Sequence, residues 1–500
     1  MTDASLKLFN SLTRQLETFQ PVHPGEARVY SCGPTVYNYP HIGNMRAYVF
    51  ADVLGRTLSF KGYELTHVIN ITDVGHLTDD ADAGEDKLER AAKANAQSIW
   101  DIAEHYTQAY WADIAALNIR QPKHWSIATQ YVPKMIEFAE RIAKAHCYEL
   151  PGGLYFDVST VADYGRLARA RTDEGEGRID PVEGKRHPED FAIWRKTPAG
   201  ETRQMEWDSP WGRGAPGWHL ECSVMSGELL GFPFDIHTGG IDHREIHHPN
   251  EIAQNQAWCG CGSLDVPAHS GAQVWMHNNF LVERSGKMSK SSGEFLRLQL
   301  LIDKGYHPLA YRLMCLQAHY RSELEFSWEG LGAALTRLKR LVMGVEKLRA
   351  RAGTKVSTGN DQFSAKLLGQ FEISMSNDLN TPEALTFLDA LALNNVGALD
   401  MNFFDQPGSV EEFCADRLAV VMAMDSVLGL DLMNLTRSDL RRRPVGAAIG
   451  EEEIEAILVE RRTARAAKDF ATSDALRDQL AAQGVDVMDG DPLGWDWRLD

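Results

Sequence analysis

A histidine, a glycine and an asparagine stand where an expected strand gives way to an expected helix. The segment ARVYSC (27–32) is typical of a buried strand, and a helix is expected over 45–58. The intervening segment GPTVYNYPHIGN contains His41, Gly43 and Asn44. Backbone N–H groups at a helix N-terminus attract phosphate, glycine lets a nucleotide approach, and histidine donates hydrogen bonds to phosphate oxygens. These residues predict an ATP site, although a loop histidine beside a glycine is more often solvated or a helix cap.

A second polar segment, SGKMSKSSG (285–293), follows an expected strand and contains Lys287, Ser289 and Lys290. Loops with two lysines among serines are usually just solvated. A mobile loop of this kind can also bring two ammonium groups to a triphosphate. There they stabilise the charge that moves onto the leaving pyrophosphate. We therefore expect these three residues to bind the nucleotide and the two lysines to act in catalysis.

The pairing of His-x-Gly-Asn with Lys-Met-Ser-Lys-Ser resembles the signature of the class I aminoacyl-tRNA synthetases. The resemblance implies a Rossmann-like parallel sheet and ATP as a substrate with Mg²⁺. It also implies activation of an amino-acid carboxylate as an adenylate. That step needs positioning and charge stabilisation more than covalent chemistry. The expected catalytic residues are accordingly His41, Asn44, Lys287 and Lys290, without a protein nucleophile.

Two cysteines, a histidine and a glutamate form a third group, although they are far apart in the chain. Cys32 ends the first strand, Cys222 lies in GWHLECS, and HHPNE contains His247 and Glu251. Two thiolates, an imidazole and a carboxylate suit zinc, and an exchangeable position on such a zinc accepts a substrate thiolate. In the alternative interpretation the cysteines are buried small residues. Pro249 would then open a helix, with His248 as its N-cap and Glu251 as a capping carboxylate, and His247 would precede the helix.

The segments GPTVYNYPHIGN, NITDV, PGWHLECS and RRTARAAKDFATSDALRDQL together resemble the cysteinyl-tRNA synthetase family across nearly the whole chain. The resemblance implies one zinc per subunit on the four residues above, with L-cysteine bound as its thiolate and tRNA(Cys) as acceptor. Zinc lowers the pKa of a thiol, whereas the hydroxyl of serine stays protonated and binds poorly. TGGIDHREIHHPNE and NITDVGHLTDD depart from the usual family pattern. The remaining implied contacts are Cys32, Gly33, Thr72 and Trp218 for cysteine, and Gly240 and Asp242 for adenosine.

Strands and helices alternate in the first third of the chain, with strands also expected at 65–71, 234–238 and 274–281. We therefore predict an α/β fold with a Rossmann-like parallel-sheet catalytic domain, followed by an α-helical bundle and a small C-terminal anticodon-binding domain. In the insertion within the catalytic domain, only LYFDV is a clear strand. The predicted helices are 86–117, 129–146, 451–468 and 473–483, and Thr381-Pro382 predicts an N-cap followed by an N1 proline. The predicted divisions are the catalytic domain 1–300 with an insertion at about 120–217, a stem-contact connector 301–330, a helical bundle 331–436 and an anticodon-recognition domain 437–500.

Composition narrows the class of protein. Five hundred residues with 44% apolar content indicate several domains, and no run of apolar residues is long enough to span a membrane. Seven cysteines without dense spacing indicate a reducing compartment, so we expect a cytoplasmic protein. We also expect a monomer. The formal charge of −19 requires any nucleic-acid partner to meet a local basic surface, for which Arg461, Arg462 and Arg465 are candidates.

Two other functions fit parts of the sequence. A cysteine ligase that acts on an amino-sugar uses the same adenylate chemistry but lacks a C-terminal tRNA-reading part. A catalytically idle tRNA-binding paralogue or regulator would keep the helical domains but could lose the ATP motifs. The arginine-rich segment RSDLRRRP (437–444), the helices after it and the two intact motifs favour the tRNA ligase.

Overall fold

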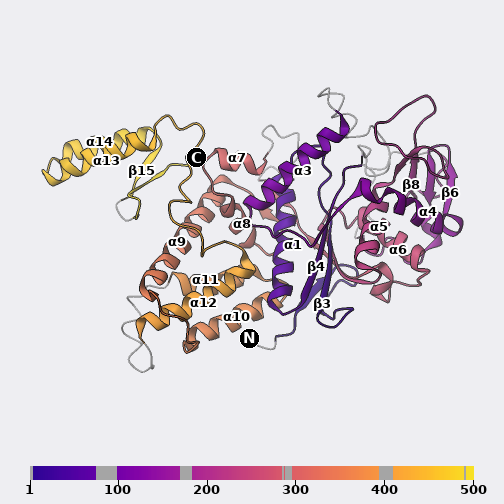
Figure 1. The fold of residues 1–500 in the computed structure, drawn as a ribbon, viewed down its shortest axis with the longest axis horizontal. Coiled ribbons are helices and arrows are strands. Elements are labelled where there is room, and N and C mark those ends of the chain that lie inside the picture. Colours follow the sequence, from indigo (N-terminus) through magenta and orange to yellow (C-terminus); the bar gives the residue numbers. More distant parts are fainter. Residues whose placement is uncertain are drawn as a thin grey trace.

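The computed structural model describes residues 4–74, 98–168, 183–283, 286–287, 296–393, 409–488 and 491–499. Figure 1 shows a central sheet with helices on either side, an insertion at one end, and a helical bundle and a small terminal unit at the other. Within the described ranges, no helix is both long and apolar enough to cross a membrane.

The predicted parallel sheet is confirmed. It has the strand order β11-β10-β3-β4-β5, and each neighbouring pair is parallel. The chain first builds outward from β3 to β5 and then returns to place β10 on the other side of β3. Ligands of open α/β sheets bind beyond the carboxyl ends of the strands at such a reversal. The strands are β3 (Glu26–Ser31), β4 (Glu64–Ile71), β5 (His124–Ile127), β10 (Phe234–Gly240) and β11 (Ala272–Asn278).

Two of the helices around the sheet, α1 and α4, begin within three residues of where the sequence places them. Helix α1 (Ile42–Phe60) starts three residues before the predicted Met45, because His41 and Asn44 form a capping box at its start. Helix α3 covers Ile99–Ala116, and the first part of the predicted 86–117 helix lies outside the described residues. The others are α4 (Val132–His146), α5 (Trp218–Leu230) and α6 (His247–Cys259).

The insertion contains more strand than predicted. Its described residues form an antiparallel sheet in the order β6-β7-β8-β9, where only LYFDV was expected. The other segments are short or nearly all buried, so their residues lack the alternation that marks a strand. Near the N-terminus, β1 (Lys7–Asn10) pairs with β2 (Gln15–Thr18). The insertion strands are β6 (Cys147–Leu150), β7 (Gly153–Phe156), β8 (Phe191–Lys196) and β9 (Gly214–Pro216).

A short sheet and a helical bundle follow the central sheet. Strand β12 (Leu281–Glu283) pairs with β13 (Gly286–Lys287) and with β14 (Leu324–Glu325). The prediction that Thr381 caps a helix is wrong, because Asn380 accepts the capping hydrogen bond from the Glu383 N–H and Thr381 is already helical. The helices are α7 (Leu298–Asp303), α8 (Pro308–Leu316), α9 (Trp328–Ala352), α10 (Gln362–Ser376), α11 (Thr381–Ala392) and α12 (Val410–Leu428).

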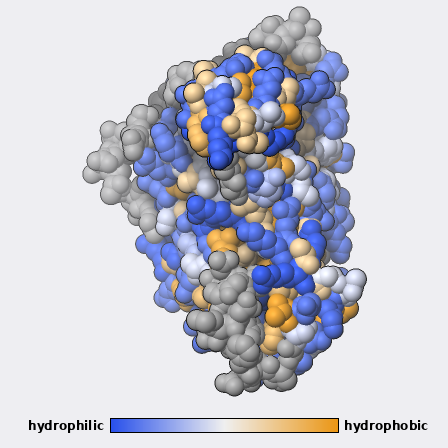
Figure 2. All heavy atoms as spheres, turned by 90° about the vertical axis from the view of Figure 1, so that its left-hand side faces the viewer, coloured by the Kyte–Doolittle hydropathy of each residue, from blue (hydrophilic) through white to orange (hydrophobic). Residues whose placement is uncertain are grey.

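The C-terminal unit pairs α13 (Glu451–Ala466) and α14 (Phe470–Ala482) with a hairpin of β15 (Val485–Val487) and β16 (Trp495–Trp497). It has its own hydrophobic core. Arg437, from the arginine-rich segment, is buried and forms ion pairs with Asp491 and Asp496. The start of the segment therefore packs against the hairpin region instead of lying in solvent. Figure 2 faces this end of the molecule and shows hydrophilic and hydrophobic side chains intermixed on it.

The structure contradicts the prediction for one of the three arginines that were expected to face RNA. Arg461 is only 7% exposed, because it lies on the side of α13 that packs against the unit's core. Arg462 and Arg465 are exposed.

Candidate active site and metal centre

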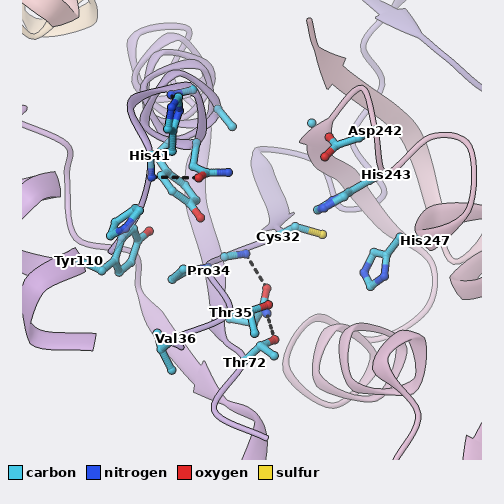
Figure 3. Close-up of a pocket in the computed structure, with 18 of the residues that line it drawn as sticks. Cys32, Pro34, Thr35, Val36, His41, Thr72, Tyr110, Asp242, His243 and His247 are labelled. Carbon is cyan, nitrogen blue, oxygen red and sulfur yellow. Dashed lines mark hydrogen bonds between the residues drawn. The ribbon is translucent and has the colours of Figure 1, made fainter. Parts of the chain in front are cut away.

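A cavity of about 380 Å³ opens at the carboxyl ends of β3 and β10, at the reversal in strand order. Figure 3 shows His41 on one side of it and Cys32, Asp242 and His247 toward the other. Residues from the end of β3, the start of α1, and helices α5 and α6 meet here. The sheet therefore brings together groups that are far apart in the sequence.

His41 and Asn44 lie at the N-terminus of α1. The Nδ1 atom of His41 accepts a hydrogen bond from the Gly43 N–H at 3.1 Å, and the Asn44 side chain accepts from the His41 N–H at 3.1 Å. Because Nδ1 accepts, the ring proton of His41 lies on Nε2, which is thus a donor for an anion. A Cβ added at Gly43 would lie 3.3 Å from the His41 ring, so glycine keeps this turn tight. Capping and anion binding are compatible here.

The four predicted metal ligands converge. Potential ligand atoms of Cys32, Cys222, His247 and Glu251 all lie within 4.8 Å of one another, and all four residues are buried. The expectation that Pro249 opens the helix is wrong, because α6 already begins at His247 and Ile246 is its N-cap. His247 and Glu251 are therefore one turn apart on one face of α6, with Nε2 and Oε1 at 2.9 Å.

The charges and pKa values of the four clustered residues favour a bound cation. Burial alone would raise the pKa of Glu251, but His237 and His247 hold it at about 2. Burial would lower the pKa of His247, but Glu251 and Cys222 raise it to about 10. Burial raises the pKa of the Cys32 thiol, and a hydrogen bond with Cys32 raises that of Cys222. A divalent cation would replace these protons, and the donor set is one that zinc prefers.

The sequence did not reveal a group of buried histidines that contact the clustered residues or one another. His237 lies 2.9 Å from the second oxygen of Glu251, and His248 lies 3.3 Å from the Cys32 sulfur. His248 in turn contacts His277 at 2.8 Å, and His219 contacts His247 at 2.9 Å. Cys32, His237, His248 and Glu251 also form a second group with ligand-like spacing. The available signal was a histidine within each of GWHLECS, FDIHT and VWMHNNFL, next to or within an expected site element.

The predicted amino-acid contacts line the same part of the cavity. The Trp218 ring lies 4.5 Å from the His247 ring, and Thr72 and Gly33 lie on the neighbouring strand ends. A Cβ at Gly33 would lie 1.7 Å from the Asn70 carbonyl oxygen, so only glycine fits there. The predicted adenosine contacts line the cavity at the last residue of β10, Gly240, and just after it, at Asp242.

The backbone of Lys287 belongs to β13 and pairs with Val282 of β12. Ser289 and Lys290 lie outside the described residues. Leu281, at the start of β12, lines the cavity beside Gly43, so the strand that leads to this segment borders the His41 end.

Comparison with known proteins decides the family. A family model for the class I (C) tRNA synthetase catalytic domain matches residues 18–336, and one for the cysteinyl-tRNA ligase anticodon-binding domain matches residues 450–498. A curated relative from Novosphingobium aromaticivorans, a cysteine–tRNA ligase, is 74% identical over 497 residues, covering 99% of this chain and 97% of the relative. The chain belongs to the cysteine–tRNA ligase family.

Other relatives agree. The cysteine–tRNA ligase of Zymomonas mobilis is 50% identical, and the alignment covers 99% of this chain and 98% of the relative. Among solved structures, the methionyl-tRNA synthetase of Mycobacterium tuberculosis with methionyl-adenylate aligns with a TM-score of 0.55 at 13% identity, covering 83% of this chain and 93% of that one. The latter likeness shows the class I fold. The finer divisions at 300, 330 and 436 stay predictions for this member of the cysteine–tRNA ligase family.

Proposed function

We propose that this chain is a cysteine–tRNA ligase that activates L-cysteine with ATP and transfers it to the 3′-terminal adenosine of tRNA(Cys). The observation that carries the proposal is one cavity with two different ends. One end has a buried thiol, imidazole and carboxylate cluster, and the other has the N-terminus of α1 with a histidine donor. The first end suits a metal and a thiol, and the second suits a triphosphate.

Cys32, Cys222, His247 and Glu251 are the proposed ligands of one zinc ion. When bound, zinc lowers the pKa of the cysteine thiol, so that cysteine binds as a thiolate while serine is rejected. An interaction that only the correct substrate makes discriminates more strongly than pocket size does. His237, His248 and the other buried histidines hold the ligand side chains in place.

The proposed reaction has two steps. A carboxylate oxygen of cysteine attacks the α-phosphorus of ATP, and pyrophosphate leaves with its bond electrons. His41 Nε2 and Asn44 bind the phosphates at the positive end of the α1 dipole, with Mg²⁺, Lys287, Ser289 and Lys290 as further proposed contacts. Gly240 and Asp242 hold the adenosine, since an aspartate accepts from ribose hydroxyls. The 2′-hydroxyl of the tRNA terminus then attacks the adenylate carbonyl, and AMP leaves.

The remaining parts of the proposal concern the whole protein. The connector at 301–330 contacts the acceptor stem, and the unit at 437–500 reads the anticodon with a surface that includes Arg462 and Arg465. We propose a cytoplasmic monomer. The match of the terminal unit to an anticodon-binding model favours tRNA over an amino-sugar acceptor.

The test is cysteine-dependent exchange between ATP and pyrophosphate on zinc-loaded protein, with serine as control, followed by charging of tRNA and of an amino-sugar. Exchange with cysteine alone and charging of tRNA(Cys) is the expected result. Lack of exchange would contradict the proposal and favour an idle tRNA-binding paralogue, whereas amino-sugar ligation would assign the other acceptor.

A further inference from the structure

A chain of three hydrogen bonds runs beneath the amino-acid end of the cavity. The Gly33 N–H donates to Asn70 Oδ1 at 2.7 Å, and Asn70 Nδ2 donates to Thr72 Oγ1 at 3.0 Å. Thr72 Oγ1 donates to Glu221 Oε2 at 3.1 Å. Figure 3 shows the first two bonds as dashed lines, with Thr72 at the lower edge of the cavity near Cys32. Asn70, Thr72 and Glu221 are each at most 2% exposed, so water does not compete with these bonds.

The direction of each bond in this chain is determined by its two ends. A backbone N–H can only donate, so Asn70 must turn its oxygen toward Gly33 and its NH₂ group toward Thr72. At the other end, the Glu221 carboxylate can only accept, so the single hydroxyl hydrogen of Thr72 points to it. The Thr72 hydroxyl has one lone pair left. It can therefore accept from a ligand in the cavity but cannot donate to one.

An amino acid presents two kinds of group beside its side chain: an ammonium, which only donates, and a carboxylate, which only accepts. Thr72 lines the same cavity as Cys32, Cys222 and Trp218, where the thiol is proposed to bind. Its remaining lone pair suits the ammonium and not the carboxylate. A buried negative charge on Glu221 directly behind the hydroxyl further favours a cation there.

We propose that Glu221 is a positioning residue that holds Thr72 as the hydrogen-bond acceptor for the α-ammonium of the bound amino acid. This inference rests on the proposed function, since it concerns the same substrate. The site then recognises two separate features of cysteine. The metal cluster binds the thiol, and the Asn70–Thr72–Glu221 chain binds the ammonium.

The test compares three thiols that differ only in their charged groups: cysteine, 3-mercaptopropionate, which lacks the ammonium, and cysteamine, which lacks the carboxylate. Glu221→Gln keeps the side-chain volume but removes the charge, and its NH₂ group can donate to Thr72 and occupy the lone pair. We expect the KM for cysteine in pyrophosphate exchange and the Ki of cysteamine to rise about 10- to 100-fold, the range for a lost charged hydrogen bond. The Ki of 3-mercaptopropionate should change less than about twofold.

Matched variants separate this effect from damage to the pocket. Glu228→Gln removes a charge from the exposed face of the same helix, α5, and should leave all three constants unchanged. Zinc content, measured by mass spectrometry, should stay at one per chain in Glu221→Gln, because the neighbouring Cys222 is intact. Thr72→Val should reproduce the pattern of Glu221→Gln and Thr72→Ser should restore the wild-type constants, which decides the matter if Glu221→Gln does not fold.

Equal weakening of cysteine and 3-mercaptopropionate in Glu221→Gln, or an unchanged KM for cysteine, would overturn the inference while wild-type exchange still supports the proposed function. Absence of cysteine-dependent exchange in the wild-type protein would overturn both.

Discussion

The two ends of the cavity are built differently. At the thiol end, the metal cluster is buried and backed by histidines that are themselves hydrogen-bonded to Glu251, Cys32 or each other. At the nucleotide end, His41 is half-buried and Asn44 is exposed, and their contacts are mostly with the backbone of one helix turn. Selectivity for a small side chain needs a rigid enclosed site, whereas ATP and a tRNA terminus need an open entrance. This difference predicts that substitutions at the two ends impair the protein in different ways.

The largest effect is expected from Cys222→Ser. Because a hydroxyl is a poor zinc ligand, zinc content should fall well below one per chain and the rate of pyrophosphate exchange should drop by about 1,000-fold or more. Metal analysis and exchange kinetics measure both. Cys414→Ser, a buried cysteine in the helical bundle, is the control. Full zinc occupancy with normal exchange in Cys222→Ser would rule out the proposed ligand set.

His41→Ala sharpens the contrast at the other end. We expect kcat for exchange to fall about 100-fold with zinc content unchanged, since one preorganised donor to the transition state is lost. The cap is also lost, which costs about 1 kcal/mol of unfolding free energy. His41→Asn restores a cap, so its melting temperature should recover while kcat stays low. If kcat recovers together with stability, His41 acts only as a cap.

His237→Phe tests whether the histidines support the metal. The ring keeps its stacking against Trp275 but no longer bonds to Glu251, so zinc affinity should weaken about tenfold. Competition with a zinc chelator measures the change. His146→Phe, at a half-buried site in the insertion, should leave affinity unchanged. Equal affinities in the wild type and His237→Phe would assign this histidine to packing alone.

A different kind of effect concerns the pH dependence of the stability of the sheet that carries both ends. Burial lowers the pKa of His67 to about 4, and its Nε2 lies 2.8 Å from the Ser31 hydroxyl. Since the folded pKa lies below the unfolded value of about 6.5, the neutral ring stabilises the fold above pH 6.5, and this contribution is lost as pH falls toward 4. Denaturant titrations should show a loss of up to about 3 kcal/mol in that window, reduced in His67→Gln. An identical pH dependence in the variant would contradict this assignment.

Sequence patterns predicted four of the five strands of the central sheet because these are buried runs separated by helices, as in 27–32 and 65–71. Strand β5 was missed, because it has only four residues and one of them is buried. They failed in the insertion, where β8 is buried along nearly its whole length and shows no alternation. The start of α6 was misplaced because proline at N1 is a preference, and here Pro249 occupies the third position of the helix instead.

The residues of the candidate site also differ in how far the sequence predicted them. The grouping of Cys32 with residues beyond 220 came from family resemblance, since spacing alone does not bring such distant residues together. The supporting histidines needed the structure, because each belongs to a strand or helix that already had another interpretation. The direction of the bonds through Thr72 depends on three elements meeting, so no local pattern contains it.

The return of the chain to place β10 beside β3 also has a consequence during synthesis. Cys32 is made early, but its partners follow only after the entire insertion has been translated. At about 5–20 residues per second, the nascent chain waits roughly 10–40 s with the β3 edge unpaired. The proposed metal-ligand set is therefore complete only after residue 251 has emerged from the ribosome. Until then the early cysteine is a free thiol, open to oxidation or to metals with a stronger preference for sulfur.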